Sequence, residues 1–314
     1  MPGEGVVCSL PKKEQLSLEK LLGEYEKSRY IKISEILELK GLGYKDGYNP
    51  SKPFEYNGET YIGIRVEPRW DEYGSQVVFF KREEKSWCKS EDLPILPNSQ
   101  DPFVTEIDNE LIIGCVEVYR SNGRIDYKTV YRDENFEKIA EIEGMKCVRV
   151  VELPNKEIGV FLRPKGSKYG RGKICYTVIN SLEELNNVNL DEAELVEGVL
   201  PEGTWGGIND VYPGKEKLYV LGHIAHFSEK ENKNYYCTIF EFDPETKKAG
   251  SPKIVVTRND FPKLPAKREP ELYNVVYPGG FSVEGRKIEI YLGISDAYAG
   301  KVTIQNPFEC FSAI

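Results

Sequence analysis

Apolar and polar positions alternate along most of this chain in a unit that recurs five times. Each unit begins with a polar residue or a turn, enters a short apolar strand, turns through Gly, Asn, Asp or Lys, and leaves by a second apolar strand. The units are residues Asn49–Pro68, Gln100–Val118, Cys147–Pro164, Gly207–Ala225 and Asn274–Ser295. They recur every ~45–70 residues, the period of a propeller blade. The pattern therefore predicts an all-β fold, a five-bladed β-propeller that forms one domain over residues 1–314.

The N-terminal part of the chain has a different period. Over residues 12–28, large apolar side chains fall at helical spacing: Leu16, Leu18, Leu21, Leu22 and Tyr25. This predicts one short amphipathic helix that packs on the body of the propeller. Residues 181–186 (SLEELN) open with Ser and have Glu three positions later, which predicts a brief helical turn with a capping box. Helices that could cover both faces of a parallel sheet are missing, so doubly wound folds are excluded.

Composition narrows the class of protein. The 314 residues carry a net charge of −9, which argues against nonspecific binding to nucleic acid or to an anionic membrane. No apolar run approaches the ~18 residues of a membrane span, and the N-terminus lacks the features of a signal peptide. Seven Cys without a CxxC motif and only two His disfavour structural zinc and a disulfide framework, so we expect no metal site and a cytoplasmic location. Whether the chain forms a homo-oligomer stays open.

In a propeller the inner strands of all blades begin near one axis, so polar residues at those positions would face one another. Asp101, in the sequence QDPF, starts one inner strand. Asp-Pro also favours turns, so the motif alone favours a turn-capping aspartate. Asn49 and Asp210 hold comparable positions in the first and fourth units. The repeat therefore favours an axial polar site.

A basic segment follows the third unit. Residues Arg163–Lys173 (RPKGSKYGRGK) contain five Lys or Arg and no acid, in a chain of net negative charge. Three Gly residues would let this loop wrap an anion closely. Arg163 is the strongest candidate, because its planar guanidinium can bind phosphate with two hydrogen bonds. The alternative is a solvated basic loop.

Several of these motifs resemble one known family. QDPFVTEIDNELIIG resembles the signature around the catalytic acid of the inverting β-mannoside phosphorylases, glycoside hydrolase family 130, although Gln100 and Phe103 depart from its usual EDPR. NVVYPGG with YLGISDAYAG, and GINDVYPGKEKLYVLGHIA, resemble later motifs of the same enzymes. YNPSKPF with YIGIRVEPRWDE is closer to the related β-1,2-mannosyltransferase/phosphorylase family, formerly of unknown function. The resemblance runs from about Tyr48 to Ile304.

The resemblance implies a five-bladed propeller enzyme, a glycoside phosphorylase that cleaves β-1,2-linked mannooligosaccharides and releases α-mannose 1-phosphate reversibly. Asp101 would be the catalytic acid, a role that needs a carboxylic acid with a raised pKa. Sugar binding is implied for Asn49, Arg65 and Asp296, with Asp210 as a further axial candidate. Phosphate binding is implied for Arg163, His223 and Tyr235, together with a lysine of the basic loop, Lys165. Inorganic phosphate is a co-substrate, and no other cofactor is expected.

Some of these residues have simpler interpretations, and the activity has rivals. His223 and Tyr235 could be packed core residues, and Trp205 could be either core or a stacking platform for a sugar. A β-mannoside hydrolase would need a second carboxylate to activate water, with Asp210 the candidate, whereas phosphate is already an anionic nucleophile. A nucleotide-sugar-dependent mannosyltransferase could use the same pocket, and a noncatalytic carbohydrate-binding propeller remains the alternative of a different class. Linkage, chain length and physiological direction stay open.

Overall fold

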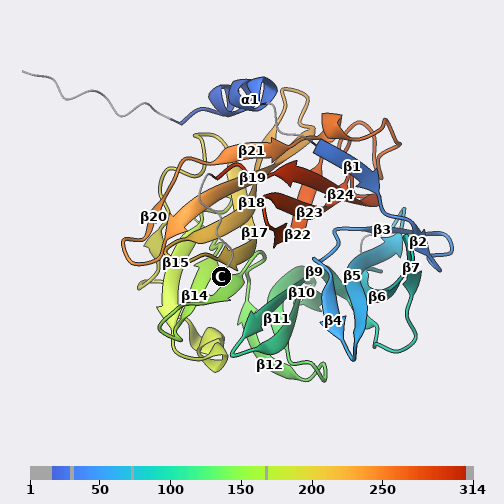
Figure 1. Ribbon diagram of the computed structural model, residues 1–314, viewed down its shortest axis with the longest axis horizontal. Coiled ribbons are helices and arrows are strands. Elements are labelled where there is room, and N and C mark those ends of the chain that lie inside the picture. The colour runs from blue at the N-terminus through green and yellow to red at the C-terminus, as the bar shows by residue number, and fades with distance from the viewer. Residues whose placement is uncertain (1–15, 29–31, 72–73, 167–168, 309–314) are drawn as a thin grey trace, which may run out of the picture.

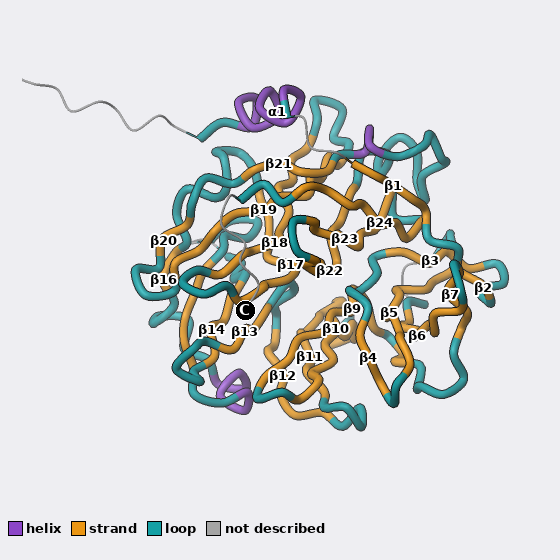
Figure 2. The backbone as a smooth tube through the Cα atoms, viewed as in Figure 1, coloured by secondary structure: helices purple, strands orange, loops and turns teal. Residues whose placement is uncertain are grey.

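The computed structural model describes residues 16–28, 32–71, 74–166 and 169–308 (Figure 1). Its strands form four hydrogen-bonded sheets of 11, 4, 4 and 5 strands that lie in a ring. The 11-stranded sheet combines two groups that meet at a single parallel pair, Tyr298 with Gly47, so five mostly antiparallel groups form the blades of a β-propeller. The helical segments lie at the outside of this ring (Figure 2). The all-β propeller fold that the sequence predicts is confirmed, and its five strand groups agree with the predicted five blades. The hairpin of each repeat unit supplies two adjacent strands of one group.

The first two blades contain the hairpins of the first and second units. Blade 1 consists of β3 (Lys45–Tyr48), β4 (Phe54–Tyr56), β5 (Glu59–Pro68), β6 (Gln76–Glu83), β7 (Ser86–Lys89), β2 (Leu39–Lys40) and β8 (Leu96–Pro97). Blade 2 consists of β9 (Ser99–Ile107), β10 (Glu110–Ser121), β11 (Arg124–Arg132) and β12 (Lys138–Glu143).

The next two blades follow in chain order. Blade 3 consists of β13 (Arg149–Glu152), β14 (Ile158–Leu162), β15 (Cys175–Ile179) and β16 (Glu194–Leu195). Blade 4 consists of β17 (Trp205–Pro213), β18 (Leu218–Phe227), β19 (Lys233–Asp243), β20 (Lys248–Ala249) and β21 (Lys253–Val256). Two 3₁₀ helices, η1 and η2, occupy Leu182–Asn187 and Arg258–Asp260.

Blade 5 closes the ring with strands from both ends of the described chain. It consists of β22 (Val276–Glu284), β23 (Lys287–Ile294), β24 (Tyr298–Gln305) and β1 (Lys32–Ile36). The outer strand β1 comes from before blade 1, and all five of its residues pair with β24. A single parallel pair, Tyr298 with Gly47, also joins β24 to β3. The backbone hydrogen bonds between these segments therefore tie the last blade to the first.

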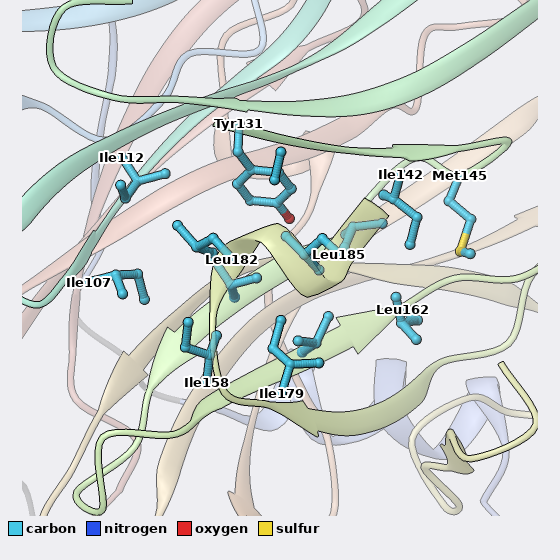
Figure 3. Close-up of a cluster of buried hydrophobic side chains, with 14 of the residues drawn as sticks. Ile107, Ile112, Tyr131, Ile142, Met145, Ile158, Leu162, Ile179, Leu182 and Leu185 are labelled. Atoms are coloured by element: carbon cyan, nitrogen blue, oxygen red, sulfur yellow. The ribbon is translucent and has the colours of Figure 1, made fainter. Parts of the chain in front are cut away.

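Apolar side chains fill the space between neighbouring blades. Figure 3 shows the cluster between blades 2 and 3, where Tyr131 and Ile112 of one blade face Leu162 and Ile158 of the next. Leu182 and Leu185 of η1 cover this cluster. The predicted helical turn is thus present, but Ser181 makes no side-chain capping bond to it. Because each cluster is shared by two blades, no blade buries its apolar surface alone.

The predicted N-terminal helix is α1, Leu18–Lys27, and Ser17 caps it by accepting a hydrogen bond from the Lys20 N–H. Residues 12–15 of the predicted segment lie outside the described residues. Leu21 is buried against Ile224 and Ile254 of blade 4. The hydroxyl of Tyr25 donates to Asp260 Oδ2 at 2.5 Å. The helix therefore packs on the outer edge of blade 4, away from the axis.

Candidate active site

A cavity of about 180 Å³ opens where the inner strands begin. Every blade contributes to it, as the repeat predicts. The residues lining it are Asn49, Arg65, Asp101, Lys146, Cys147, Arg163, His223, Lys233, Tyr235, Leu272, Val275, Tyr277 and Asp296. Seven of the nine site residues expected from the sequence are in this set, and Asp210 and Lys165 are not. The carboxylates, cations and tyrosines are thus brought together from segments more than 240 residues apart.

The backbone is unusual at the positions where polar side chains enter the cavity. Asn49, Asp101, Cys147 and Asp296 have positive φ angles of 46°, 50°, 58° and 51°. This left-handed region is sparsely populated by residues other than glycine, although Asn and Asp tolerate it best. Such conformations cluster at functional sites, where the surrounding fold holds them in place. Four positions that line the cavity, from four different blades, therefore share one uncommon conformation.

A β-bulge presents Asp101. Gly114 of β10 pairs with Phe103, and Val116 pairs with Gln100, so two residues of β9 oppose one residue of β10. Bulges of this kind redirect side chains and recur next to active sites. Asp101 is 8 % exposed. Its Oδ1 accepts a hydrogen bond from Asn49 Nδ2 at 2.8 Å and forms an ion pair with Arg65 Nη1 at 3.4 Å.

The charge balance around Asp101 differs from the expectation for an acid. Burial by itself would raise its pKa, but the positive charges of Arg65 and Lys146 and the hydrogen bond from Asn49 outweigh burial and lower the pKa. The raised pKa expected of an acid is therefore not found at Asp101. The carboxyl whose pKa is raised is Asp296, to about 6, because burial dominates over the attraction of Arg65.

Arg65 is held by a buried carboxylate. Glu67, on the same strand β5, is fully buried and lies 3.0 Å from Arg65 Nη2. It also accepts hydrogen bonds from Tyr48, Ser75 and Lys267. Burial would raise the pKa of Glu67, but Arg65 and these donors outweigh it and lower the pKa. The network fixes the guanidinium that reaches Asp101.

Arg163, His223 and Tyr235 form the second part of the site, in blades 3 and 4. Arg163 Nε donates to the Gly206 carbonyl at 2.5 Å. The imidazole of His223 is 3 % exposed and stacks on Tyr235, with ring centroids 5.4 Å apart. Burial and the positive charge of Arg163 lower the pKa of His223 to about 3, so this ring is neutral at physiological pH. The three residues line the cavity as expected.

Two residues expected at the site have other partners. Asp210 forms an ion pair with Lys52 at 3.2 Å and accepts hydrogen bonds from the backbone N–H groups of Val211 and Phe281. Its carboxylate therefore joins blade 4 to blades 1 and 5 instead of lining the cavity. Lys165 donates to the Tyr127 hydroxyl, outside the cavity lining. Lys168, of the same basic loop, lies outside the described residues.

Trp205 is a packed residue. It is 7 % exposed, and its indole N–H donates to the Tyr235 hydroxyl at 3.4 Å. Its ring also packs against Phe227. Of its two interpretations, the core position is therefore the one that the structure supports.

Sequence reasoning missed four polar residues of the cavity. Lys146 supplies the cation that the basic loop was expected to supply: burial lowers its pKa despite the attraction of Asp101, and its Nζ donates to Gln100 Oε1 at 3.0 Å. Cys147 Sγ and the Tyr277 hydroxyl lie 3.4 Å apart, and Lys233 completes the set. Cys147 opens the third repeat unit and Tyr277 lies three residues after the start of the fifth, so the repeat itself held a signal for them.

Neither a metal centre nor a membrane span is visible in the part of the chain that the structure describes. No group of three or more His, Cys, Asp or Glu residues there is arranged to hold a metal ion. None of the described helices is long and apolar enough to cross a membrane.

Comparison with solved structures places this architecture among mannose-processing propellers. The mannose phosphorylase MPT-4 from Leishmania mexicana, solved in complex with a phosphate ion, is 26 % identical with a TM-score of 0.82, over 93 % of both chains. The GDP-Man-dependent mannosyltransferase MPT-1 from the same organism is 26 % identical with a TM-score of 0.82, over 95 % of this chain and 97 % of that one.

A more distant likeness shows the fold alone. The β-1,2-mannobiose phosphorylase from Listeria innocua is 14 % identical with a TM-score of 0.60, over 87 % of this chain and 90 % of that one. No curated protein sequence matches this chain. The family described as "Protein of unknown function (DUF1861)" matches residues 23–310. The chain belongs to this family.

Proposed function

We propose that this protein is an inverting β-mannoside phosphorylase that cleaves β-1,2-linked mannooligosaccharides with inorganic phosphate and releases α-mannose 1-phosphate, in a reversible reaction. One observation carries the proposal: a single cavity combines the carboxylates Asp101 and Asp296 with the cations Arg163 and Lys146 and the imidazole of His223. The likeness at 26 % identity to a mannose phosphorylase solved with phosphate supports it.

The cationic group suits an anionic nucleophile. Arg163 is fixed by its bond to the Gly206 carbonyl, and a fixed guanidinium can bind phosphate oxygens through parallel hydrogen bonds. Lys146 takes the place of Lys165 as the lysine of this group, because it lines the cavity. Tyr235 adds a hydroxyl beside His223. These groups would hold phosphate against the anomeric carbon of the bound mannosyl unit.

Asp101 would protonate the leaving group. Its proton passes to the glycosidic oxygen, the bond from that oxygen to the anomeric carbon breaks, and a phosphate oxygen forms the new bond from the opposite face. Arg65 and Lys146 hold the pKa of Asp101 below its usual value. A bound phosphate anion would offset the field of Lys146, and a bound sugar would exclude water, so both would raise that pKa toward the value an acid needs.

Asn49, Arg65 and Asp296 would hold the mannosyl unit next to the cleaved bond. They offer an amide, a guanidinium and a carboxyl, which together supply donors and acceptors for sugar hydroxyls. Asn49 and Arg65 also contact Asp101 directly. Sugar binding and the acid would therefore be coupled through the same side chains.

A hydrolase is the second candidate, and Asp296 is the observation that favours it. Since Asp210 is engaged elsewhere, Asp296 is the other carboxyl that lines the cavity. Incubation with β-1,2-mannobiose in the presence of phosphate, followed by phosphorus and proton NMR, tests the proposal. A phosphorylase gives α-mannose 1-phosphate, whereas a hydrolase gives only free mannose.

A further inference from the structure

Asn209 occupies a second bulge, directly behind His223. Ile208 pairs with Gly222 and Asp210 pairs with Leu221, so Asn209 is the extra residue of β17. Its side chain is completely buried, and its Oδ1 lies 2.7 Å from His223 Nδ1. Arg149 donates to its backbone carbonyl. The bulge therefore points the Asn209 side chain at the imidazole that lines the cavity.

This contact fixes which nitrogen of His223 carries the proton. An amide oxygen can only accept a hydrogen bond, so Nδ1 must be the protonated nitrogen. The ring is neutral, because burial and Arg163 hold its pKa near 3. In a neutral imidazole with a proton on Nδ1, Nε2 carries a lone pair. The ring nitrogen left for a ligand is thus an acceptor.

We propose that Asn209 is a positioning residue that holds His223 as a hydrogen-bond acceptor toward the cavity, and that the anion site therefore selects oxyanions that carry a proton. The inference rests on the proposed binding of phosphate beside His223. Both forms of phosphate present near neutral pH have at least one P–OH group that can donate to Nε2. Sulfate has the same shape and charge as hydrogen phosphate but no proton, so its oxygen would face the lone pair.

Within the described residues, Asn209 is the hydrogen-bond partner of His223 Nδ1. The charged and titratable side chains that act on its ring are Arg163, Arg149, Asp101, Tyr235 and Tyr277. Asn209 Nδ2 has no hydrogen-bond partner within the described residues. Reversal of the amide would turn that nitrogen to His223, make Nε2 a donor and remove the discrimination.

Inhibition of the wild-type enzyme tests the inference without any variant. Arsenate carries protons near neutral pH as phosphate does, whereas sulfate does not. We expect arsenate to replace phosphate as the nucleophile. We expect the inhibition constant of sulfate to be at least ~10-fold higher than the dissociation constant of phosphate, because sulfate lacks one hydrogen bond and turns an oxygen toward the lone pair of Nε2. Sulfate that competes as strongly as phosphate binds would overturn the inference.

A matched pair of variants tests the role of Asn209. Asn209→Asp should stabilise a protonated His223 ring, convert Nε2 to a donor and reduce the preference for phosphate over sulfate by ~10-fold. It should also make the KM for phosphate depend on pH as His223 titrates. The control His226→Asn changes the other histidine, which contacts Tyr236 outside the cavity lining, and should keep the preference. An Asn209→Asp enzyme with unchanged preference would contradict the positioning role.

The two proposals fail in different ways. If phosphate does not accelerate cleavage by the wild-type enzyme, the proposed phosphorolysis is wrong. If phosphate accelerates cleavage but sulfate competes equally well, phosphorolysis stands and the acceptor role of His223 is wrong.

Discussion

The side-chain amide of Asn49 donates a 2.8 Å hydrogen bond to Asp101, and this bond joins the start of blade 1 to the start of blade 2. Both residues are buried and both have a left-handed backbone. Each side chain enters the cavity from a left-handed backbone conformation, which glycine and asparagine adopt most readily. The backbone of two blades therefore determines the relative placement of Asn49 and Asp101. The proposed acid and a proposed sugar ligand therefore act as one unit.

Loss of the Asn49 amide should weaken catalysis without unfolding the protein. Asn49→Gly removes the hydrogen bond but keeps the positive φ accessible. We expect kcat/KM to fall ~10-fold, because the variant loses a bond that positions the Asp101 carboxyl and, on the proposed function, a contact to a sugar hydroxyl, and an unmade hydrogen bond at a buried site costs about 1–3 kcal/mol. Steady-state kinetics measure the effect, with Asn57→Gly as control, since Asn57 also has a positive φ but lies in the β4–β5 turn. Equal kcat/KM values for the two variants would show that Asn49 does not contribute to catalysis by Asp101.

Removal of the acid should depend on the leaving group. We expect Asp101→Asn to lose ~10²-fold or more in kcat on β-1,2-mannobiose, the usual effect of losing general acid catalysis. An aryl β-mannoside with an acidic phenol needs little protonation, so the same variant should recover much of its rate on that substrate. Asp296→Asn serves as the comparison and should show no such recovery. The reverse pattern would make Asp296 the acid.

Two substitutions in the basic loop test which residue binds phosphate. Arg163→Ala should raise the KM for phosphate by ~10-fold or more, because charge-assisted hydrogen bonds are lost. Lys165→Ala should change it little, since Lys165 contacts Tyr127 instead of lining the cavity. Initial rates at varied phosphate and saturating sugar give both values. A larger effect from Lys165 would restore the loop itself as the anion site.

Asp296 should make stability depend on pH. Its pKa is raised from 3.8 to about 6, so the native state binds this proton more tightly than the unfolded chain. Ionisation of Asp296 therefore destabilises the fold, a cost that is absent below pH about 4, grows toward pH 6 and is complete above it. Asp296→Asn should be more stable than wild type at pH 7, on the order of 3 kcal/mol, and the gap should close near pH 4. A gap that does not vary with pH would contradict this account.

The sequence predicted the fold and most of the cavity because the repeat determines both. Alternation with period two identified five hairpins, and equivalent positions in those hairpins meet at the axis. The repeat indicates Asn49 and Asp101 in this way, whereas Asp296 follows from the family resemblance. Cys147 occupies the same position in the third unit, but its side chain carries no obvious sugar-binding chemistry and was passed over.

The errors come from local backbone detail that hydrophobic periodicity does not contain. One extra residue in β17 reverses the faces of its neighbours, so Asn209 reaches His223 while Asp210 turns to Lys52. The lowered pKa of Asp101 depends on Lys146, which lies just before the third unit and reaches the cavity only in the folded ring. Charge in the basic loop indicated a cation at the site, but loop conformation decided which cation lines the cavity.

The most direct test of the central claim is the rate at which the wild-type enzyme cleaves β-1,2-mannobiose in buffer with and without inorganic phosphate. A phosphorylase has no nucleophile in phosphate-free buffer, so the account predicts negligible cleavage there and a saturable increase as phosphate is added, with one α-mannose 1-phosphate formed for each bond broken. Equal cleavage in phosphate-free buffer, with free mannose as the product, would contradict it.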